Sequence, residues 1–293
     1  MTTLIERPAR TGAERLPGGR LLGWAEWGPA DGTPVLLSPG AATSRRLGMG
    51  AAAPGDLGVR LISLDRPGLG ASTPAPGRTF ADFAADVEVF AGRLGLGRPA
   101  MVGNSQGAPF ALACAAAGVV GALALVSAAD EVAAPRFADA LPDELRRLTE
   151  LSTHDPQAAE QVFAGFTPQA MWDLVMGGSP ACDLAVYQGP EFADGYREAL
   201  GEAFAQGPAG YARDTVLAMG RWGIDLSSIT VPVDVWYGEH DATHSPDQGE
   251  GLTARIPGAV RHVVPGVGGA LLWTHPHRIL RALLERLPAS AAR

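Results

Sequence analysis

The clearest candidate for chemistry in the sequence is a Gly-x-Ser-x-Gly stretch at residues 103–107, with Ser105 at its centre. An apolar run at 99–102 precedes this stretch, and an Ala-rich run at 108–117 follows it. Strand, sharp turn and helix in that order are the context in which this motif holds a nucleophilic serine on a tight turn. The flanks therefore predict a nucleophile elbow that exposes the Ser105 hydroxyl.

Composition restricts the other chemistries that the chain can perform. The 293 residues are 46% hydrophobic and 18% charged, which is typical of one large globular domain or of a domain with an insertion. The net charge is −8 and there is no basic patch, so we expect no nucleic-acid partner. All 23 basic residues are arginine. The absence of lysine excludes mechanisms built on a lysine Schiff base or a phosphate-loop lysine.

Cysteine usage and hydropathy bear on the compartment. Cys114 and Cys182 lie far apart and form neither a metal-binding pattern nor a disulfide framework. The first 20 residues lack an apolar signal core, and the richest apolar run, at 108–126, is interrupted by two glycines. The sequence predicts a cytoplasmic protein without a membrane partner, and no motif implies a metal or an organic cofactor.

Short apolar runs alternate with helical patterns in the first part of the chain. The runs typical of strands are residues 20–27, 35–37, 59–64, 100–102 and 121–126. A helix is expected to begin at Thr79, which would be its N-cap with Asp82 three residues later. This alternation predicts a mostly parallel sheet with right-handed crossovers. Residues 1–19 are expected to be an irregular lead-in.

The alternation stops after residue 128. Residues 128–210 are rich in helix formers and turn residues and contain no convincing strand pattern. Helices are expected at 141–151, 156–166, 210–219 and, at the end of the chain, 276–287; strands return at 231–237 and 259–264. Helices inserted between two parts of one sheet indicate a cap over the carboxyl ends of the strands, where such sheets bind ligands. We therefore expect a core at 1–128, a helical cap at 129–215 and the rest of the core at 216–293.

Four stretches make the sequence resemble the α/β-hydrolase superfamily, and most closely its capped esterase and proline-iminopeptidase-like group. They are residues 34–46, 64–70, 103–107 and 229–275. The stretches come from both halves of the expected core and follow the order that the family requires. The resemblance implies an α/β-hydrolase fold, with a mostly parallel central sheet flanked by helices and a helical cap insertion.

The resemblance also implies roles for individual residues. Ser105 matches the nucleophile, and Asp241, which follows the expected strand at 231–237, matches the acid. The backbone N–H groups of Ala41 and Gln106 match the two donors of the oxyanion hole. Some relatives place the acid where this chain has Asp130, which we rank below Asp241.

Two positions depart from the family pattern. Pro39 stands where the loop that carries Ala41 usually has a histidine, and this puts the geometry of that loop in doubt. More seriously, the family's Pro-Gly-x-Gly-His pattern aligns with residues 265–269, so that Gly269 occupies the position of the catalytic histidine. A serine hydroxyl needs an adjacent base to become a nucleophile. Of the six histidines, His244 and His154 are the first candidates for a substitute base, because His244 follows the acid closely and His154 lies in the cap.

Three functions are compatible with this pattern. The first is an enzyme that acts on an ester, thioester or amide carbonyl of a small molecule through Ser105, with an incomplete triad and either a relocated base or low activity. The alternative is a non-hydrolytic enzyme of cyclase, lyase or isomerase type, for example in secondary metabolism, that reuses the pocket and the oxyanion hole. The third is a catalytically silent binding protein, which the retention of Ser105, Gln106 and Asp241 disfavours.

The substrate pocket is expected to be apolar. The cap offers large apolar side chains at spacings that suit one helical face: Phe163, Phe166, Met171, Trp172 and Met176. Trp273 follows Gly269 closely and is expected to form a wall of the same pocket. Together they predict an apolar or acyl small molecule as the substrate, without identifying it.

Overall fold

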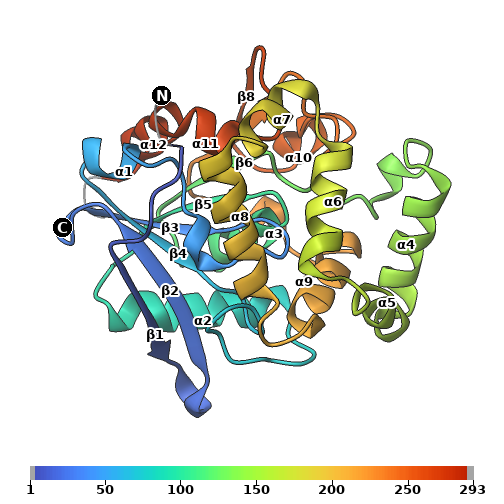
Figure 1. Cartoon of the computed structure of the whole chain (residues 1–293), viewed down its shortest axis with the longest axis horizontal. Coiled ribbons are helices and arrows are strands. Elements are labelled where there is room, and N and C mark those ends of the chain that lie inside the picture. Colours follow the sequence, from blue (N-terminus) through green and yellow to red (C-terminus); the bar gives the residue numbers. More distant parts are fainter. Residues whose placement is uncertain (1–3, 289–293) are drawn as a thin grey trace.

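The computed structural model describes residues 4–288, and Figure 1 shows their arrangement. Within these residues one eight-stranded sheet has the strand order β1-β2-β4-β3-β5-β6-β7-β8. The strands are β1 (Arg10–Arg15), β2 (Leu21–Trp27), β3 (Thr33–Ser38), β4 (Val59–Leu64), β5 (Ala100–Asn104), β6 (Ala122–Val126), β7 (Val233–Gly238) and β8 (Val260–Val264). All neighbours from β4 to β8 pair in parallel, whereas β1 and β2 are antiparallel to their neighbours. The mostly parallel sheet expected from the sequence is confirmed.

Strand β1 corrects the expectation that residues 1–19 are an irregular lead-in. It pairs with β2 in the register Arg10↔Glu26 to Arg15↔Leu21. This strand is at the edge of the sheet, and most of its side chains are exposed. The apolar alternation that marks a half-buried strand is therefore absent from its sequence.

Helices cover both faces of the sheet. One buried cluster joins the sheet to α2 (Phe80–Arg93), α3 (Gly107–Ala116) and α10 (Glu250–Ala254). The opposite cluster joins it to α1 (Ala53–Asp56), α11 (Leu271–Thr274) and α12 (Pro276–Glu285). The predicted start of α2 is confirmed, because the Thr79 hydroxyl accepts from the Asp82 N–H at 3.2 Å while the Asp82 carboxylate accepts from the Thr79 N–H at 2.8 Å.

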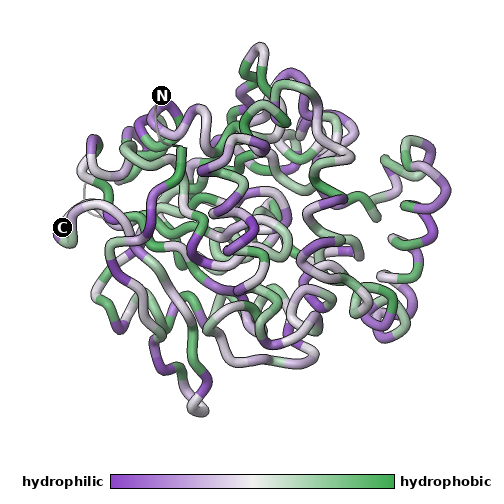
Figure 2. Tube along the Cα trace, in the orientation of Figure 1, coloured by the Kyte–Doolittle hydropathy of each residue, from purple (hydrophilic) through white to green (hydrophobic). Residues whose placement is uncertain are grey.

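A helical insertion separates β6 from β7. Its helices are α4 (Asp143–His154), α5 (Pro156–Phe163), α6 (Pro168–Gly178), α7 (Ala181–Tyr187), α8 (Pro190–Ala203) and α9 (Ala209–Met219). In Figure 1, α8 (gold) lies in front of the central part of the molecule, α6 (yellow) stands to its right, and α4 and α5 lie further to the right. Figure 2 shows hydrophobic and hydrophilic residues alternating along α4 and α5, as expected of helices with one packed face. The division into core and cap stays a prediction.

One expectation about the insertion is wrong. The apolar side chains predicted to share one helical face belong to two helices and the turn between them. Phe163 ends α5, and Phe166 lies in the turn. A new helix begins because the Thr167 hydroxyl accepts from the Ala170 N–H at 3.1 Å and Pro168 occupies the first turn. Across residues 4–288, no helix has the length and apolar character needed to span a membrane.

Candidate active site

Ser105 lies on a strained turn between β5 and α3. Its φ of 49° is in the left-handed region, which costs a non-glycine residue about 1–3 kcal/mol. The neighbouring glycines let the backbone segments cross, because a Cβ on Gly103 would lie 2.8 Å from the Ala111 Cβ and one on Gly107 would lie 2.1 Å from the Ser38 carbonyl oxygen. The Ser105 N–H is held by the Val126 carbonyl at 3.1 Å. The side chain is half-buried, at the point where β5 ends.

The loop after β3 lies directly beside this serine. A Cβ built on Gly40 would be 3.4 Å from the Ser105 Cβ and 3.9 Å from its Oγ. In the described part of the chain, neither the Ala41 N–H nor the Gln106 N–H donates a hydrogen bond to the protein. Both groups are therefore available to an oxygen bound next to Ser105.

A buried arginine braces this loop, and sequence reasoning missed it. Arg66 donates from Nη2 to the Gly40 carbonyl at 2.9 Å and from Nη1 to the Pro39 carbonyl, and its side chain is completely buried. The Gly40 carbonyl and the Ala41 N–H belong to one trans peptide and point in opposite directions. Arg66 therefore orients the peptide that carries the Ala41 N–H, in a loop where the family histidine is replaced by Pro39.

Helix α9 supports the groups on both sides of Ser105. Asp214 accepts from the Arg66 Nε at 2.6 Å, and both side chains are inaccessible to solvent. The next residue, Thr215, accepts from the Gln106 side-chain amide at 3.0 Å. Asp214 thus supports the loop that carries Ala41, through Arg66, and the next residue of α9, Thr215, supports the side chain of Gln106. No motif in the sequence indicated either contact.

Asp241 is paired with His244, three residues further along the loop after β7. The His244 Nδ1 lies 2.8 Å from Oδ1 and 3.1 Å from Oδ2 of the buried Asp241 carboxylate. A proton on Nδ1 leaves Nε2 as a proton acceptor. Burial opposes the charge of Asp241, but the charge and hydrogen bond of His244 outweigh it and lower the pKa of the carboxyl. Burial also opposes the charge of His244, but Asp241 and then Asp183 outweigh it and raise the pKa of the imidazole.

The His244 ring lies against Gly269. A Cβ built on Gly269 would be 2.8 Å from His244 Cε1 and 3.4 Å from Nδ1. The imidazole therefore occupies the space into which a side chain at residue 269 would project. The structure brings together three positions that the sequence singled out: Asp241, His244 and Gly269.

A third carboxylate reaches the same place from the helical insertion. Asp183 of α7 is 2% exposed. Its Oδ2 accepts from the Gly269 N–H at 2.6 Å, and its Oδ1 accepts from the N–H groups of Gly268 and Ala270 at 3.2 Å each. Sequence reasoning missed Asp183, because an isolated acid in an unassigned helix carries no motif.

The other substitute base does not join this group. His154 is exposed at the C-terminal end of α4. The four remaining histidines have other surroundings: His240 is exposed, His262 stacks on Trp236 and bonds Asp234, His275 contacts Thr274, and His277 bonds Asp56. Within residues 4–288, no histidine nitrogen forms a hydrogen bond with the Ser105 hydroxyl.

Asp130, the alternative acid, contacts the loop after β7 but not the imidazole of His244. Asp130 accepts from Arg136 at 2.7 Å and from the Ser245 hydroxyl at 3.0 Å, and its N–H donates to the His244 carbonyl at 3.2 Å. Burial raises the pKa of its carboxyl and outweighs the opposing charge of Arg136. Asp130 thus holds the backbone of the loop, while Asp241 holds the imidazole.

The aromatic residues predicted to line the pocket pack against aromatic side chains of α8 and α9. Trp172 lies 5.9 Å from Tyr196 between ring centroids, with Arg197 stacked over it at 3.7 Å. Phe166 lies 5.3 Å from Tyr211, and Trp273 meets Phe192 edge-on at 5.0 Å. Met176 is half-buried against the same cluster. Their role in binding a substrate stays a prediction.

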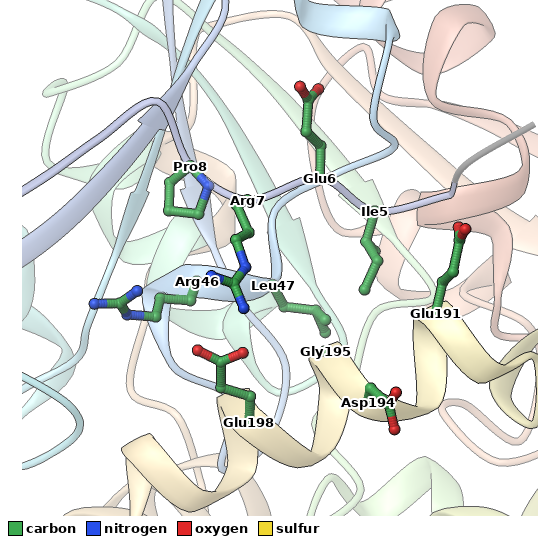
Figure 3. Close-up of a pocket in the computed structure, with 10 residues that line it drawn as sticks. All are labelled: Ile5, Glu6, Arg7, Pro8, Arg46, Leu47, Glu191, Asp194, Gly195 and Glu198. Carbon is green, nitrogen blue, oxygen red and sulfur yellow. The ribbon is translucent and has the colours of Figure 1, made fainter.

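A cavity of about 240 Å³ lies elsewhere, between the N-terminal segment and α8 (Figure 3). Its lining includes Ile5 to Pro8, Arg46, Leu47 and the α8 residues Glu191, Asp194, Gly195 and Glu198. None of the residues beside Ser105 lines it. Among the described residues, no group of three or more His, Cys, Asp or Glu side chains is arranged to hold a metal ion.

Comparison with known proteins defines the family. The family model described as alpha/beta hydrolase fold matches residues 33–276, and the chain therefore belongs to the α/β-hydrolase family. No curated protein matches the chain. The resemblance recognised from the sequence motifs is thus confirmed.

Solved structures share the fold at low sequence identity. Est816, described as an N-acyl homoserine lactone degrading enzyme, is 21% identical, with a TM-score of 0.65 over 92% of this chain and 99% of its own. A thermophilic esterase from Thermogutta terrifontis is 23% identical, with a TM-score of 0.62 over 94% and 97%. The enol-lactonase from Burkholderia xenovorans LB400 is 19% identical, with a TM-score of 0.65 over 94% and 98%. Membership of the family supports hydrolase activity for this chain, and the likeness to these structures shows the fold.

Proposed function

We propose that this chain is a serine hydrolase of small ester or lactone substrates, in which His244 replaces the family's catalytic histidine. The observation that carries the proposal is the placement of the His244 imidazole, which is bonded to Asp241 and lies against Gly269. A base that enters from the loop after β7 would thus occupy the space vacated at residue 269. The esterases and lactonases among the structural neighbours support the choice of substrate class.

The proposed reaction uses the groups around Ser105 in turn. Ser105 Oγ attacks the substrate carbonyl carbon while His244 Nε2 takes the hydroxyl proton. The negative oxygen of the tetrahedral intermediate is bound by the N–H groups of Ala41 and Gln106, each worth about 3 kcal/mol if it resembles a measured donor. The protonated His244 then gives its proton to the departing alkoxide, which leaves an acyl-serine. A water molecule, deprotonated by His244, attacks the acyl carbon, and the returned proton releases Ser105 and the carboxylic acid.

The charge of Asp241 fits this role for His244. The carboxylate holds the ring with Nδ1 as donor and stabilises the imidazolium that forms during each half-reaction. Since the pKa of His244 is raised above its ordinary 6.5, neutral base is lost as the pH falls through a value above 6.5. The proposed hydrolase is therefore expected to lose activity already in mildly acidic solution.

A second candidate is a non-hydrolytic reaction at the same site, such as a cyclisation or elimination. The observation that favours it is that no histidine nitrogen in the described residues is hydrogen-bonded to the Ser105 hydroxyl. A carbonyl can be polarised by the Ala41 and Gln106 N–H groups without a serine nucleophile. Hydrogen bonds between base and nucleophile are, however, often long in enzymes without substrate, so the hydrolase remains our proposal.

Acylation of Ser105 separates the two candidates. Purified protein is mixed with p-nitrophenyl butyrate, and the burst of nitrophenol, the steady-state rate and the mass of the protein are measured. The hydrolase predicts an acyl adduct and turnover that are lost in Ser105→Ala and fall by a factor of at least about 100 in His244→Ala, whereas the matched control His154→Ala keeps the wild-type rate. Wild-type protein that forms no adduct with this ester or with an alkyl fluorophosphonate would contradict the proposal and favour the non-hydrolytic reaction.

The cytoplasmic location expected from the sequence stays a prediction.

A further inference from the structure

The Asp183 carboxylate is hydrogen-bonded to the backbone segment that contacts the His244 ring. Three consecutive N–H groups, from Gly268 to Ala270, donate to its two oxygens, the shortest at 2.6 Å. Hydrogen bonds to a charged acceptor are stronger than neutral ones. The buried position of Asp183 leaves this backbone as its main source of compensation. The contact therefore fixes residues 268–270 relative to α7.

Two consecutive glycines make this arrangement sterically possible. A Cβ on Gly268 would lie 2.3 Å from Asp183 Oδ2, and a Cβ on Gly269 would lie 2.8 Å from His244 Cε1. One glycine thus admits the carboxylate from the helical insertion, and the other admits the imidazole. The Asp183 carboxylate and the His244 ring thus contact adjacent residues of one short loop.

Asp183 also acts on His244 through its charge. The charged groups that face the imidazole in the described residues are Asp241 on its own loop and Asp183 on α7, and both favour the protonated ring. Thr243 contributes a neutral hydroxyl 3.3 Å from Nδ1. Loss of the Asp183 charge would weaken the preference for imidazolium without touching the Asp241 hydrogen bond.

Helix α7 rests on the same segment at a second point. Tyr187, one helical turn after Asp183, meets the ring of Trp273 edge-on at 6.0 Å between centroids. Trp273 belongs to α11, which begins directly after Ala270. The helix therefore contacts the 268–273 segment through one charged and one aromatic side chain on the same face.

From these contacts we infer that Asp183 is a positioning residue for the proposed base. Its hydrogen bonds hold the 268–270 backbone against α7, and this backbone in turn holds the His244 ring in position. The inference rests on the proposed function and adds to it a coupling between the helical insertion and the base. Without the Asp183 carboxylate, residues 268–270 lose three charge-assisted hydrogen bonds, and the backbone against which the imidazole packs is no longer fixed.

The test compares Asp183→Asn with Asp194→Asn, a matched change at an exposed acid of α8. Butyrate ester hydrolysis is measured from pH 5 to 9, together with the melting temperature and the fraction of Ser105 that reacts with fluorophosphonate. We expect kcat per reactive site to fall by about 10- to 100-fold in Asp183→Asn, as for a catalytic group misplaced by up to about 1 Å. The midpoint of the acid limb should move to lower pH, because one of the two carboxylates that raise the pKa of His244 loses its charge. Asp194→Asn should match the wild type in both.

A second variant reaches the same contact from the other side. Gly268→Ala places a Cβ against Asp183 Oδ2 and should displace the carboxylate while Asp183 itself is unchanged. It should lower kcat in the same way, and it keeps the inference testable if Asp183→Asn does not fold. A wild-type kcat and an unmoved acid limb in either folded variant would overturn the inference, even if the melting temperature falls. Full activity of His244→Ala would instead refute the proposed function, so the two failures are distinguishable.

Discussion

A single methyl group added to Gly269 tests whether the His244 ring must lie against that residue. The Cβ of Gly269→Ala would be 2.8 Å from His244 Cε1, whereas an ordinary contact between carbon atoms is about 3.5 Å or longer. The imidazole must therefore retreat by about 0.7 Å (3.5 minus 2.8). Gly269 is outside the left-handed region of φ, so alanine brings no backbone strain of its own. A misplacement of about 1 Å can cost a factor of 100 in rate, and we expect kcat for ester hydrolysis to fall by about 10- to 100-fold.

The assay is p-nitrophenyl butyrate hydrolysis, expressed per Ser105 that reacts with fluorophosphonate. Gly201→Ala on α8 is a matched control, because a Cβ there would meet nothing within 4 Å. This control should keep the wild-type rate and gain slightly in helix stability. A Gly269→Ala variant that folds and hydrolyses the ester at the wild-type rate would refute the reasoning, since the ring could then not depend on the space at residue 269.

Three further predictions concern the surroundings of Ser105. Arg66→Met leaves Asp214 buried with one partner fewer, and the free energy of unfolding measured in urea should fall by about 3–5 kcal/mol; a change below 1 kcal/mol would contradict the brace. Thr215→Val removes the acceptor of the Gln106 side chain and should weaken binding of a boronate that mimics the tetrahedral intermediate by about 10-fold, with the melting temperature as a check on folding; equal boronate affinity would argue against this support. Because the pKa of Asp241 is lowered from 3.8, its stabilising contribution is present above pH 3.8 and is lost as the pH falls through its folded value; Asp241→Asn should therefore differ from wild type in unfolding free energy more at pH 6 than at pH 2, and the opposite order would contradict the pairing with its histidine.

Local patterns were sufficient to predict most of the fold. Strand β6 is apolar throughout, and β4 is apolar except for Arg60 and Ser63. Both strands are bounded by turn residues, and Thr79 with Asp82 marked the start of α2 to the residue. Strand β1 escaped prediction because its stability comes from pairing with β2 and not from an apolar face of its own. The helix expected at 156–166 ends at Phe163, and the start of α6 escaped prediction although Thr167 and Pro168 are its N-cap and first-turn proline.

The candidate site was predictable only in part, for a physical reason. Ser105 and Asp241 carry motifs, and the gap at Gly269 was visible from its flanks. The place of the His244 ring depends on contacts between distant parts of the chain, which no local pattern contains. Asp183 shows the same limit, since its partners lie more than 80 residues further along the chain.

Exchanging the side chains of residues 244 and 269 tests most directly whether the base lies at residue 244 in place of residue 269. The measurement is the rate at which p-nitrophenyl butyrate acylates Ser105 in His244→Ala and in the double variant His244→Ala with Gly269→His. We expect a loss of at least about 100-fold in the single variant and a partial recovery in the double variant, because the imidazole then projects from the family position into the space that His244 has left. Acylation of His244→Ala at the wild-type rate would show that His244 is not the base.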